Sequence, residues 1–275
     1  MSPRRTVFVT GATAGLGLAV CEALATDGHR LIVHGRTATS AAEVADLLRT
    51  QGAEVTPVHA ELGSLSGLAE LAEQVRSCTD RLDVLVNNAG IGAGPPPHAT
   101  REQSAEGHEL RFAVNYLAAV QITRLLLPLL EASTPSRIVN VGSVGQAPPD
   151  FDDIDFYHGY SGVQAYFRSK FAVAAFSREL ALRLPAGISV TCVHPASMMD
   201  TKQVREVGVP PWCTVQSGVQ PVLRLVLADA GLRNGAYYDG VTASSPHPSV
   251  ADAKIRARLW QLTDELLGPF SDPIR

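Results

Sequence analysis

The stretch TVFVTGATAGLG, at residues 6–17, decides the fold class that the sequence predicts. Its first five residues are apolar or β-branched, which is typical of a buried strand, and its glycines lead into an alanine- and leucine-rich helix. Such a turn lets the backbone approach a pyrophosphate, whose charge is favoured at a helix N-terminus. A simple tight turn needs one glycine and this one has three, so it predicts a dinucleotide site. Five residues of the turn are expected to touch the cofactor: Gly11, Thr13, Gly15, Leu16 and Gly17.

Beyond this turn, apolar strands alternate with helical stretches. The expected strands are residues 6–10, 30–34, 54–59, 83–87, 137–141 and 188–193. The expected helices are residues 16–25, 41–50, 65–75, 105–130 and 163–184. Strands that are apolar on both faces indicate a parallel sheet covered by helices on both sides. No break is long enough for a linker, so residues 1–275 are expected to form one α/β domain, a doubly wound parallel sheet of the Rossmann type.

The composition is that of an ordinary globular protein, with 45% hydrophobic and 18% charged residues. A net charge of -4 gives no basic surface for nucleic acid. The four cysteines are scattered without a CxxC or a ligand-like spacing to histidine, so we expect no disulfide framework, no metal site and a reducing cytoplasm. No apolar signal segment precedes the first strand, and the apolar stretch at residues 118–130 is short for a bilayer and interrupted by Arg124 and Pro128. We therefore expect a cytoplasmic protein with no membrane partner.

The position after the second strand should read the adenosine ribose of a dinucleotide. A carboxylate there accepts hydrogen bonds from the ribose hydroxyls and repels a 2′-phosphate. Here Gly35 is followed by Arg36, whose guanidinium suits a phosphate, although a solvated loop arginine is the plain alternative. The sequence therefore favours NADP(H) over NAD(H).

Tyr166 and Lys170 stand four residues apart in an expected helix and therefore share one face. A lysine beside a tyrosine can lower the pKa of the phenol, which then works as an acid or base near neutral pH. The pair alone is weak evidence, but downstream of a dinucleotide turn it predicts a proton donor opposite a nicotinamide.

Five motifs in this order resemble those of the classical short-chain dehydrogenase/reductase family, over residues 6 to about 238. They are the turn at residues 10–17, Asn87-Asn88-Ala89-Gly90, Asn115 in the sequence VNY, Ser143 after the fifth strand, and Tyr166 with Lys170. The resemblance implies an oxidoreductase that interconverts a ketone or aldehyde and an alcohol by hydride transfer with NADP(H). Its other partner is then a small carbonyl or alcohol substrate.

The resemblance also implies a role for each motif residue. Tyr166 acts as the acid or base, and Lys170 stabilises the tyrosinate and binds the nicotinamide ribose. Ser143 holds the substrate oxygen and offsets its developing charge, unless it is a plain turn serine. Asn115 anchors a water that relays protons to Lys170, unless it only caps or kinks its helix. Three further residues would complete the cofactor site: Asn88, Ala89 and Gly90.

Two positions depart from the family pattern. Glu61 stands where an aspartate commonly contacts adenine, so the contact falls to its longer side chain or to the backbone of Leu62. Thr201 lies one place later than the family's threonine, and Asp200 occupies the expected slot. Either the loop carries one extra residue and Thr201 reaches the nicotinamide, or Asp200 faces the substrate.

Three irregular stretches follow strand ends, where ligands bind in open parallel sheets: residues 92–100, 148–162 and 196–218. We expect the last to form a substrate lid. The long segment between Ser143 and Tyr166 resembles the retinol-dehydrogenase-like branch, whose members act on varied ketones and alcohols. The alternatives are a non-redox catalyst of dehydration, cyclisation or epimerisation, and a cofactor-sensing regulator, which ranks last because both Tyr166 and Lys170 are present.

The helices expected at residues 105–130 and 163–184 are apolar around much of their circumference. Packing on the sheet covers only one face of each, so the remaining surface is expected to meet another subunit. The family pattern points the same way. The sequence therefore predicts a homodimer or homotetramer.

Overall fold

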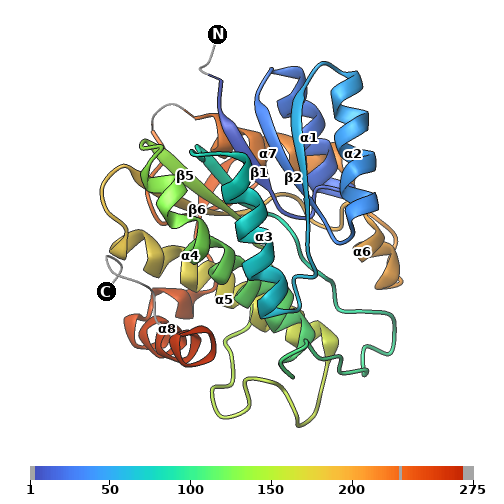
Figure 1. Ribbon diagram of the computed structural model, residues 1–275. Coiled ribbons are helices and arrows are strands. Elements are labelled where there is room, and N and C mark those ends of the chain that lie inside the picture. The colour runs from blue at the N-terminus through green and yellow to red at the C-terminus, as the bar shows by residue number, and fades with distance from the viewer. Residues whose placement is uncertain (1–3, 229–230, 269–275) are drawn as a thin grey trace.

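The computed structural model describes residues 4–228 and 231–268 (Figure 1). Within these residues, eight strands form one sheet in the order β3-β2-β1-β4-β5-β6-β7-β8, in which β1 to β7 run parallel and β8 antiparallel to β7. The strands are β1 (Thr6–Val9), β2 (Arg30–Gly35), β3 (Glu54–His59), β4 (Val84–Asn87), β5 (Ser136–Val141), β6 (Ile188–His194), β7 (Ala236–Asp239) and β8 (Thr242–Ser244). The predicted doubly wound α/β fold is confirmed, and the six predicted strands agree with β1 to β6 to within one residue at each end.

Helices cover both faces of the sheet. They are α1 (Gly15–Thr26), α2 (Ala38–Thr50), α3 (Leu65–Cys78), α4 (Ala118–Glu131), α5 (Gly162–Arg183), α6 (Lys202–Glu206), α7 (Gln216–Leu227) and α8 (Ala253–Leu267). Side chains of α1, α2 and α7 build the core on one face, and those of α3, α4, α5 and α8 build the core on the other. In β1, Phe8 belongs to the second core while Val7 and Val9 belong to the first, which explains why the strands are apolar on both sides.

The helix predicted at residues 105–130 begins later than expected. Residues 103–109 form a turn, with Gly107 at a φ of +89°, and regular helix starts at residue 110. The Glu109 carboxylate accepts the backbone N–H of Phe112 at 2.8 Å and so caps the start of the helix. A π-helical stretch, η1 (Phe112–Leu117), then precedes α4. The predicted start was wrong because the turn needs a left-handed glycine and uses a side chain as its cap.

The combined helix of η1 and α4, Phe112–Glu131, is longer than the apolar stretch considered above. By length and composition it could cross a membrane, but 67% of its most apolar window is buried in the fold. Burial on that scale is typical of a core helix in a globular domain.

Several elements after β6 were not predicted. They are α6, α7, β7, β8, a short 3₁₀ helix η2 (Pro248–Ala251), and α8. The predicted lid at residues 196–218 therefore contains α6, and its last residues already belong to α7.

Helix α8 packs on the outer surface of α5 and its neighbours (Figure 1). The Trp260 ring stacks on Phe176 of α5 with a centroid distance of 6.0 Å. Arg256 of α8 pairs with Glu179 of α5 at 2.9 Å, and both side chains are largely buried. A homo-oligomer is expected above because the outer surface of this helix is taken to be uncovered. That premise is wrong in part, because α8 of the same chain lies on it.

Candidate active site

The glycine turn lies directly against the segment that follows β4. The Asn88 side-chain amide donates to the carbonyl oxygens of Thr10 and Gly11, at 2.9 and 3.1 Å. A Cβ on Gly11, whose φ is +64°, would lie 2.9 Å from the Cα of Ala89, and a Cβ on Gly17 would overlap the Gly11 carbonyl oxygen. Only glycine fits at these two positions, because the turn packs closely against the segment after β4 and against its own backbone.

A buried histidine supports the same turn. The Gly11 N–H donates to Nδ1 of His34 at 3.1 Å, so Nε2, which lies 3.1 Å from the Ala60 carbonyl oxygen, must be the donor there. Burial lowers the pKa of His34, which keeps the ring neutral as this pair of contacts requires. The sequence analysis missed His34, although an imidazole at the end of a buried strand was a signal for it.

Arg36, at the position expected to read the ribose, lies beside Glu61, which replaces the aspartate expected near adenine. Nε of Arg36 is 3.8 Å from a carboxylate oxygen of Glu61, and both side chains are more than half exposed. The other Glu61 oxygen accepts the Gly63 N–H at 3.1 Å, whereas Leu62 is buried. The Thr13 methyl carbon is 2.8 Å from the point where a Cβ on Gly35 would lie. These predicted residues therefore gather beyond the ends of β2 and β3.

Lys170 is buried and donates from Nζ to the Val141 carbonyl oxygen at 2.9 Å. Burial lowers the pKa of Lys170 to about 8. A Cβ placed on Gly90 would lie 3.6 Å from Lys170 Nζ and 3.1 Å from Asn115 Oδ1, so Gly90 lies close to both side chains. Three motifs that lie far apart in the sequence thus converge at one place.

Burial raises the pKa of Tyr166, and the nearby Ser143 hydroxyl acts in the opposite direction without cancelling the rise. The expectation that Lys170 lowers this pKa is not met in this arrangement. The ammonium is bonded to Val141, and Nζ is 5.9 Å from the Tyr166 ring centroid.

The loop that carries Ser143 is held by residues that the sequence analysis did not identify. The Ser143 carbonyl oxygen accepts from the Tyr237 hydroxyl at 2.9 Å and from the Gln146 side-chain amide at 2.6 Å. The Ser143 hydroxyl oxygen accepts the Gly145 N–H at 3.1 Å, so its own hydrogen can point to the Tyr166 oxygen. Tyr237 lies in β7, which was not predicted, so nothing placed it near the site.

Asn115 sits in the π-helical stretch and is buried. Its Oδ1 accepts the Ile91 N–H at 2.7 Å, and its Nδ2 donates to the Ile91 carbonyl at 3.0 Å and to the Ser169 hydroxyl at 2.9 Å. The side chain thus joins the loop after β4 to helix α5. These contacts use both Nδ2 hydrogens and one lone pair of Oδ1, which leaves the second Oδ1 lone pair and the Asn115 backbone as binding points for a water.

The loop after β6 places Thr201 and Asp200 differently. The Thr201 methyl carbon lies 3.3 Å from the Cβ position of Gly15, and the Thr201 oxygen accepts the Val204 N–H to cap α6. Asp200 is paired bidentately with Arg205, at 2.7 and 2.9 Å, and the hydrogen bond from Arg205 lowers the Asp200 pKa. The geometry favours the alternative in which Thr201 faces the cofactor turn.

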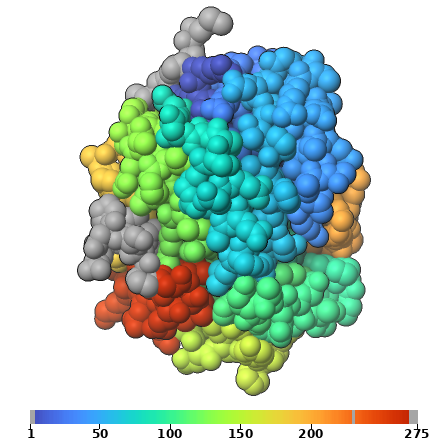
Figure 2. All heavy atoms as spheres, viewed as in Figure 1, coloured from blue at the N-terminus to red at the C-terminus, as the bar shows by residue number. Residues whose placement is uncertain are grey.

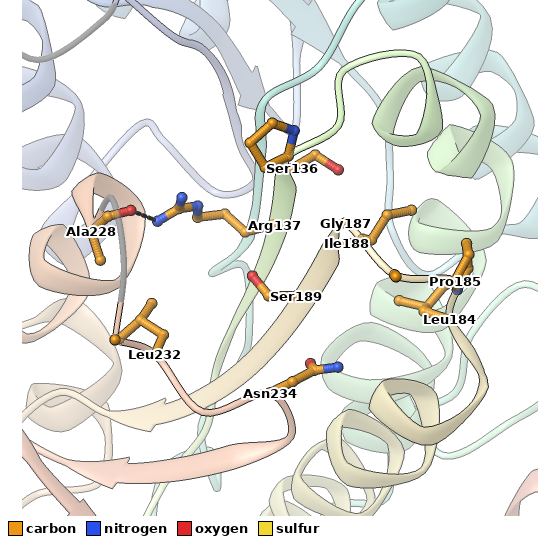
Figure 3. Close-up of a pocket in the computed structure, with 13 residues that line it drawn as sticks. Ser136, Arg137, Leu184, Pro185, Gly187, Ile188, Ser189, Ala228, Leu232 and Asn234 are labelled. Atoms are coloured by element: carbon orange, nitrogen blue, oxygen red, sulfur yellow. Dashed lines mark hydrogen bonds between the residues drawn. The ribbon is translucent and has the colours of Figure 1, made fainter.

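A cavity lies away from these residues, near the amino ends of β5 and β6 (Figure 3). It has a volume of about 320 Å³ and is bordered by Arg137, Ser189 and Asn234 among others, with Arg137 bonded to the Ala228 carbonyl. Among its described lining residues is none of the predicted site residues. Ligands of open parallel sheets bind at the carboxyl ends of the strands, so the candidate site is the opposite edge.

Metal chemistry has no visible support in the described ranges. Among residues 4–228 and 231–268, no group of three or more histidine, cysteine, aspartate or glutamate side chains is placed to hold a metal ion.

Comparison with known proteins agrees with this geometry. A family model described as short chain dehydrogenase matches residues 5–209. Human retinol dehydrogenase 13 is 32% identical, over 99% of this chain and 87% of that protein. An uncharacterized protein from Mycobacterium paratuberculosis superposes with a TM-score of 0.80 and 26% identity, over 98% of this chain and 97% of that chain. RhlG of Pseudomonas aeruginosa, in a complex with NADP, gives a TM-score of 0.70 and 26% identity, over 86% of this chain and 94% of that chain.

Proposed function

The chain belongs to the short-chain dehydrogenase family, and we propose that it uses NADP(H) to interconvert a ketone or aldehyde and an alcohol by hydride transfer. The observation that carries this proposal is the convergence of Ser143, Tyr166 and Lys170 at the edge of the sheet that carries the glycine turn. Asn115 and Gly90 lie beside Lys170, so each of the five motifs contributes to this edge.

The residues present fit a dinucleotide. The glycine turn, which contains Gly11, Gly15 and Gly17, leads into the N-terminus of α1, where a pyrophosphate is favoured. The cofactor, when bound, supplies or accepts the hydride. Tyr166 and Lys170 would hold its nicotinamide end, and Thr201 lies against the turn from the lid side.

Ser143, Tyr166 and Lys170 have different roles in the proposed reaction. Ser143 holds the carbonyl oxygen of the substrate, and Tyr166 donates its proton to that oxygen as the carbonyl is reduced. The raised pKa of Tyr166 keeps the phenol protonated, which is the form that reduction requires. The buried Lys170 ammonium, whose Nζ is 5.9 Å from the Tyr166 ring centroid, would hold the nicotinamide ribose beside the tyrosine.

Arg36 supports a preference for NADP(H) over NAD(H). It stands where a carboxylate would favour NAD(H), and its guanidinium can bind a 2′-phosphate through two hydrogen bonds. Its contact with Glu61 is long and exposed, so a phosphate can displace it at little cost. The complex of RhlG with NADP shows that a protein of similar fold binds this cofactor.

A screen of ketones and aldehydes tests the proposal. Retinaldehyde belongs in the screen because similar proteins are retinol dehydrogenases. We expect at least one compound to be reduced while NADPH is consumed in equal amount, and NADH to support a slower reaction. Product that forms without NADPH consumption would favour the non-redox alternative, whose only hint was Asp200, now paired with Arg205. No turnover of any kind would contradict both.

The chain is proposed to act as one domain, with α6 and its flanks in residues 196–218 as the substrate lid. Gln203 of α6 already packs against Gly92 of the loop after β4. Its Cγ is 2.6 Å from the point where a Cβ on Gly92 would lie. Proteolysis with and without NADPH would test the lid, since we expect the cofactor to protect it.

Location and assembly are proposed from composition and family pattern. A cytoplasmic enzyme without a membrane or nucleic-acid partner fits the net charge of -4 and the burial of the Phe112–Glu131 helix. A homodimer or homotetramer stays a prediction, and it would have to use surface that α8 leaves exposed, such as Leu182 of α5, which is 70% exposed. Cell fractionation and light scattering test the two statements.

A further inference from the structure

Glu109, Arg111 and Tyr160 form a closed triangle of hydrogen bonds behind the candidate site. Nη1 of Arg111 donates to Glu109 Oε1 at 3.2 Å and to the Tyr160 hydroxyl at 2.9 Å. The Tyr160 hydroxyl donates in turn to Glu109 Oε1 at 2.9 Å. Glu109 and Arg111 are 1% and 3% exposed, so the ion pair is shielded from water.

The triangle is bonded to two segments that carry motif residues. Nε of Arg111 donates to the Gly92 carbonyl at 2.9 Å, just after the segment that ends in Gly90. The second Glu109 oxygen accepts the Phe112 N–H at 2.8 Å, at the start of the π-helical stretch that contains Asn115.

The third corner of the triangle fixes the beginning of α5. Tyr160 directly precedes Ser161, whose side chain caps α5, and Tyr166 lies in the first turns of that helix. The Gly162 N–H donates to the His98 carbonyl at 2.7 Å, so the start of α5 is also tied to the loop after β4. Figure 2 shows the segment around residues 95–110 in green beside the yellow-green loop before α5.

A buried ion pair is not the cheapest way to hold these segments together. Removing two charges from water costs several kcal/mol, and well-packed apolar side chains often stabilise a fold as well or better. What the pair adds is direction, because each donor and acceptor fixes an angle as well as a distance. The Tyr160 hydroxyl donates its hydrogen to Glu109 Oε1, so it is engaged in the fold and does not replace Tyr166 as the proton donor.

We propose that Glu109, Arg111 and Tyr160 act as a positioning cluster, which sets Asn115 and Tyr166 relative to each other for the reaction proposed above. The inference rests on the proposed function. None of the three contacts the reacting groups themselves, so each acts through the segment that it holds.

Tyr160→Phe tests the cluster with the smallest change. The ring can keep its edge contact with Phe156, while both hydrogen bonds of the hydroxyl are lost. Because displacement of a catalytic group by about 1 Å can cost about 100-fold in rate, we expect kcat to fall at least about tenfold. The affinity for NADPH should not change, because the glycine turn and Arg36 lie elsewhere.

Glu179→Gln is the matched control on the same helix. Glu179 also belongs to a buried ion pair, with Arg256, and lies thirteen residues beyond Tyr166, or about 20 Å along α5. We expect this change to lower Tm and to leave kcat unaltered, when both are measured well below the unfolding range. An equal loss of kcat in the two variants at equal loss of Tm would overturn the inference, because activity would then only follow stability.

Hydrogen exchange gives a readout that does not depend on activity. In Tyr160→Phe we expect faster amide exchange at residues 91–94, at residues 110–117 and in the first turn of α5, with the rest of α5 unchanged. Exchange that changes only around residue 160 would overturn the coupling, as would an unaltered kcat. If the wild-type protein reduces no carbonyl compound, the proposed function fails while the exchange pattern still decides whether the cluster couples these segments.

Discussion

The two halves of helix α5 differ in the residues that they carry and in the contacts that hold them. The first half carries Tyr166 and Lys170 and is held by polar contacts to loops at the carboxyl edge of the sheet. The second half carries Phe176 and Glu179 and is covered by α8. One continuous helix thus carries candidate catalytic residues in its first half and core-packing residues in its second half. Substitutions along it should therefore change activity and stability separately.

The kinds of contact differ accordingly. Near the N-terminus, buried polar groups fix positions, and burial alters the pKa values of both Tyr166 and Lys170. Near the C-terminus, the Phe176 and Trp260 rings stack, and the ion pair of Glu179 with Arg256 connects two helices. Substitutions in the first half should act on rates, and those in the second half on the free energy of unfolding.

The largest effect is expected for Tyr166→Phe. Loss of general acid catalysis costs roughly 100- to 10,000-fold, so turnover should nearly vanish while the ring still packs and NADPH still binds. Steady-state kinetics and cofactor titration measure the two parts. Substantial residual activity would mean that another group donates the proton.

The opposite result is expected for Trp260→Ala in α8. Trp260 is 8% exposed and stacks on Phe176, and its truncation should lower the free energy of unfolding by about 3–5 kcal/mol. The value of kcat per folded molecule should not change. Chemical denaturation and kinetics on the same sample test this, and a parallel fall in kcat would break the comparison between the two halves of α5.

Arg36→Ala extends the comparison to the cofactor side of the site. Hydrogen bonds between charged groups contribute about 1.5–3 kcal/mol, so the affinity for NADPH should fall by about 10- to 100-fold. The affinity for NADH should stay the same. Equal losses for both cofactors, or tighter NADH binding by the wild-type protein, would refute the preference.

The smallest effect is expected in the loop after β6. Thr201→Ala should weaken cofactor binding by about 1 kcal/mol, because one hydrogen bond is at stake. Asp200→Ala should have little effect on binding or turnover, since Arg205 already pairs with this carboxylate. If Asp200→Ala instead cuts turnover and spares cofactor affinity, the lid contributes an acid and the ketoreductase proposal loses its support.

Local signals account for what the sequence predicted well. The strands β1 to β6 are short apolar runs bounded by turns, and parallel pairing brings their carboxyl ends to one edge whatever the loops do. Motif residues at those ends, such as Gly11, Gly90 and Ser143, therefore meet without any knowledge of the loops. Their convergence could be predicted from order and spacing.

The contacts that were missed depend on longer distances along the chain. In α8, Arg256, Leu259, Trp260 and Thr263 are buried, and their spacing is the one-face pattern of a helix. The pattern could have revealed the helix, but nothing local shows which surface it covers. The positioning cluster joins side chains about fifty residues apart through two irregular loops, so only the folded structure could reveal it.

The most direct test of the account follows the hydride. NADPH deuterated at its transferable position should be mixed with a carbonyl compound that the wild-type protein reduces, and the alcohol should be analysed by mass spectrometry. We predict one deuterium on the carbinol carbon for each NADPH consumed, little product with Tyr166→Phe, and unchanged labelling with Trp260→Ala. Alcohol without deuterium, or product formed with no NADPH consumed, would contradict hydride transfer at this site.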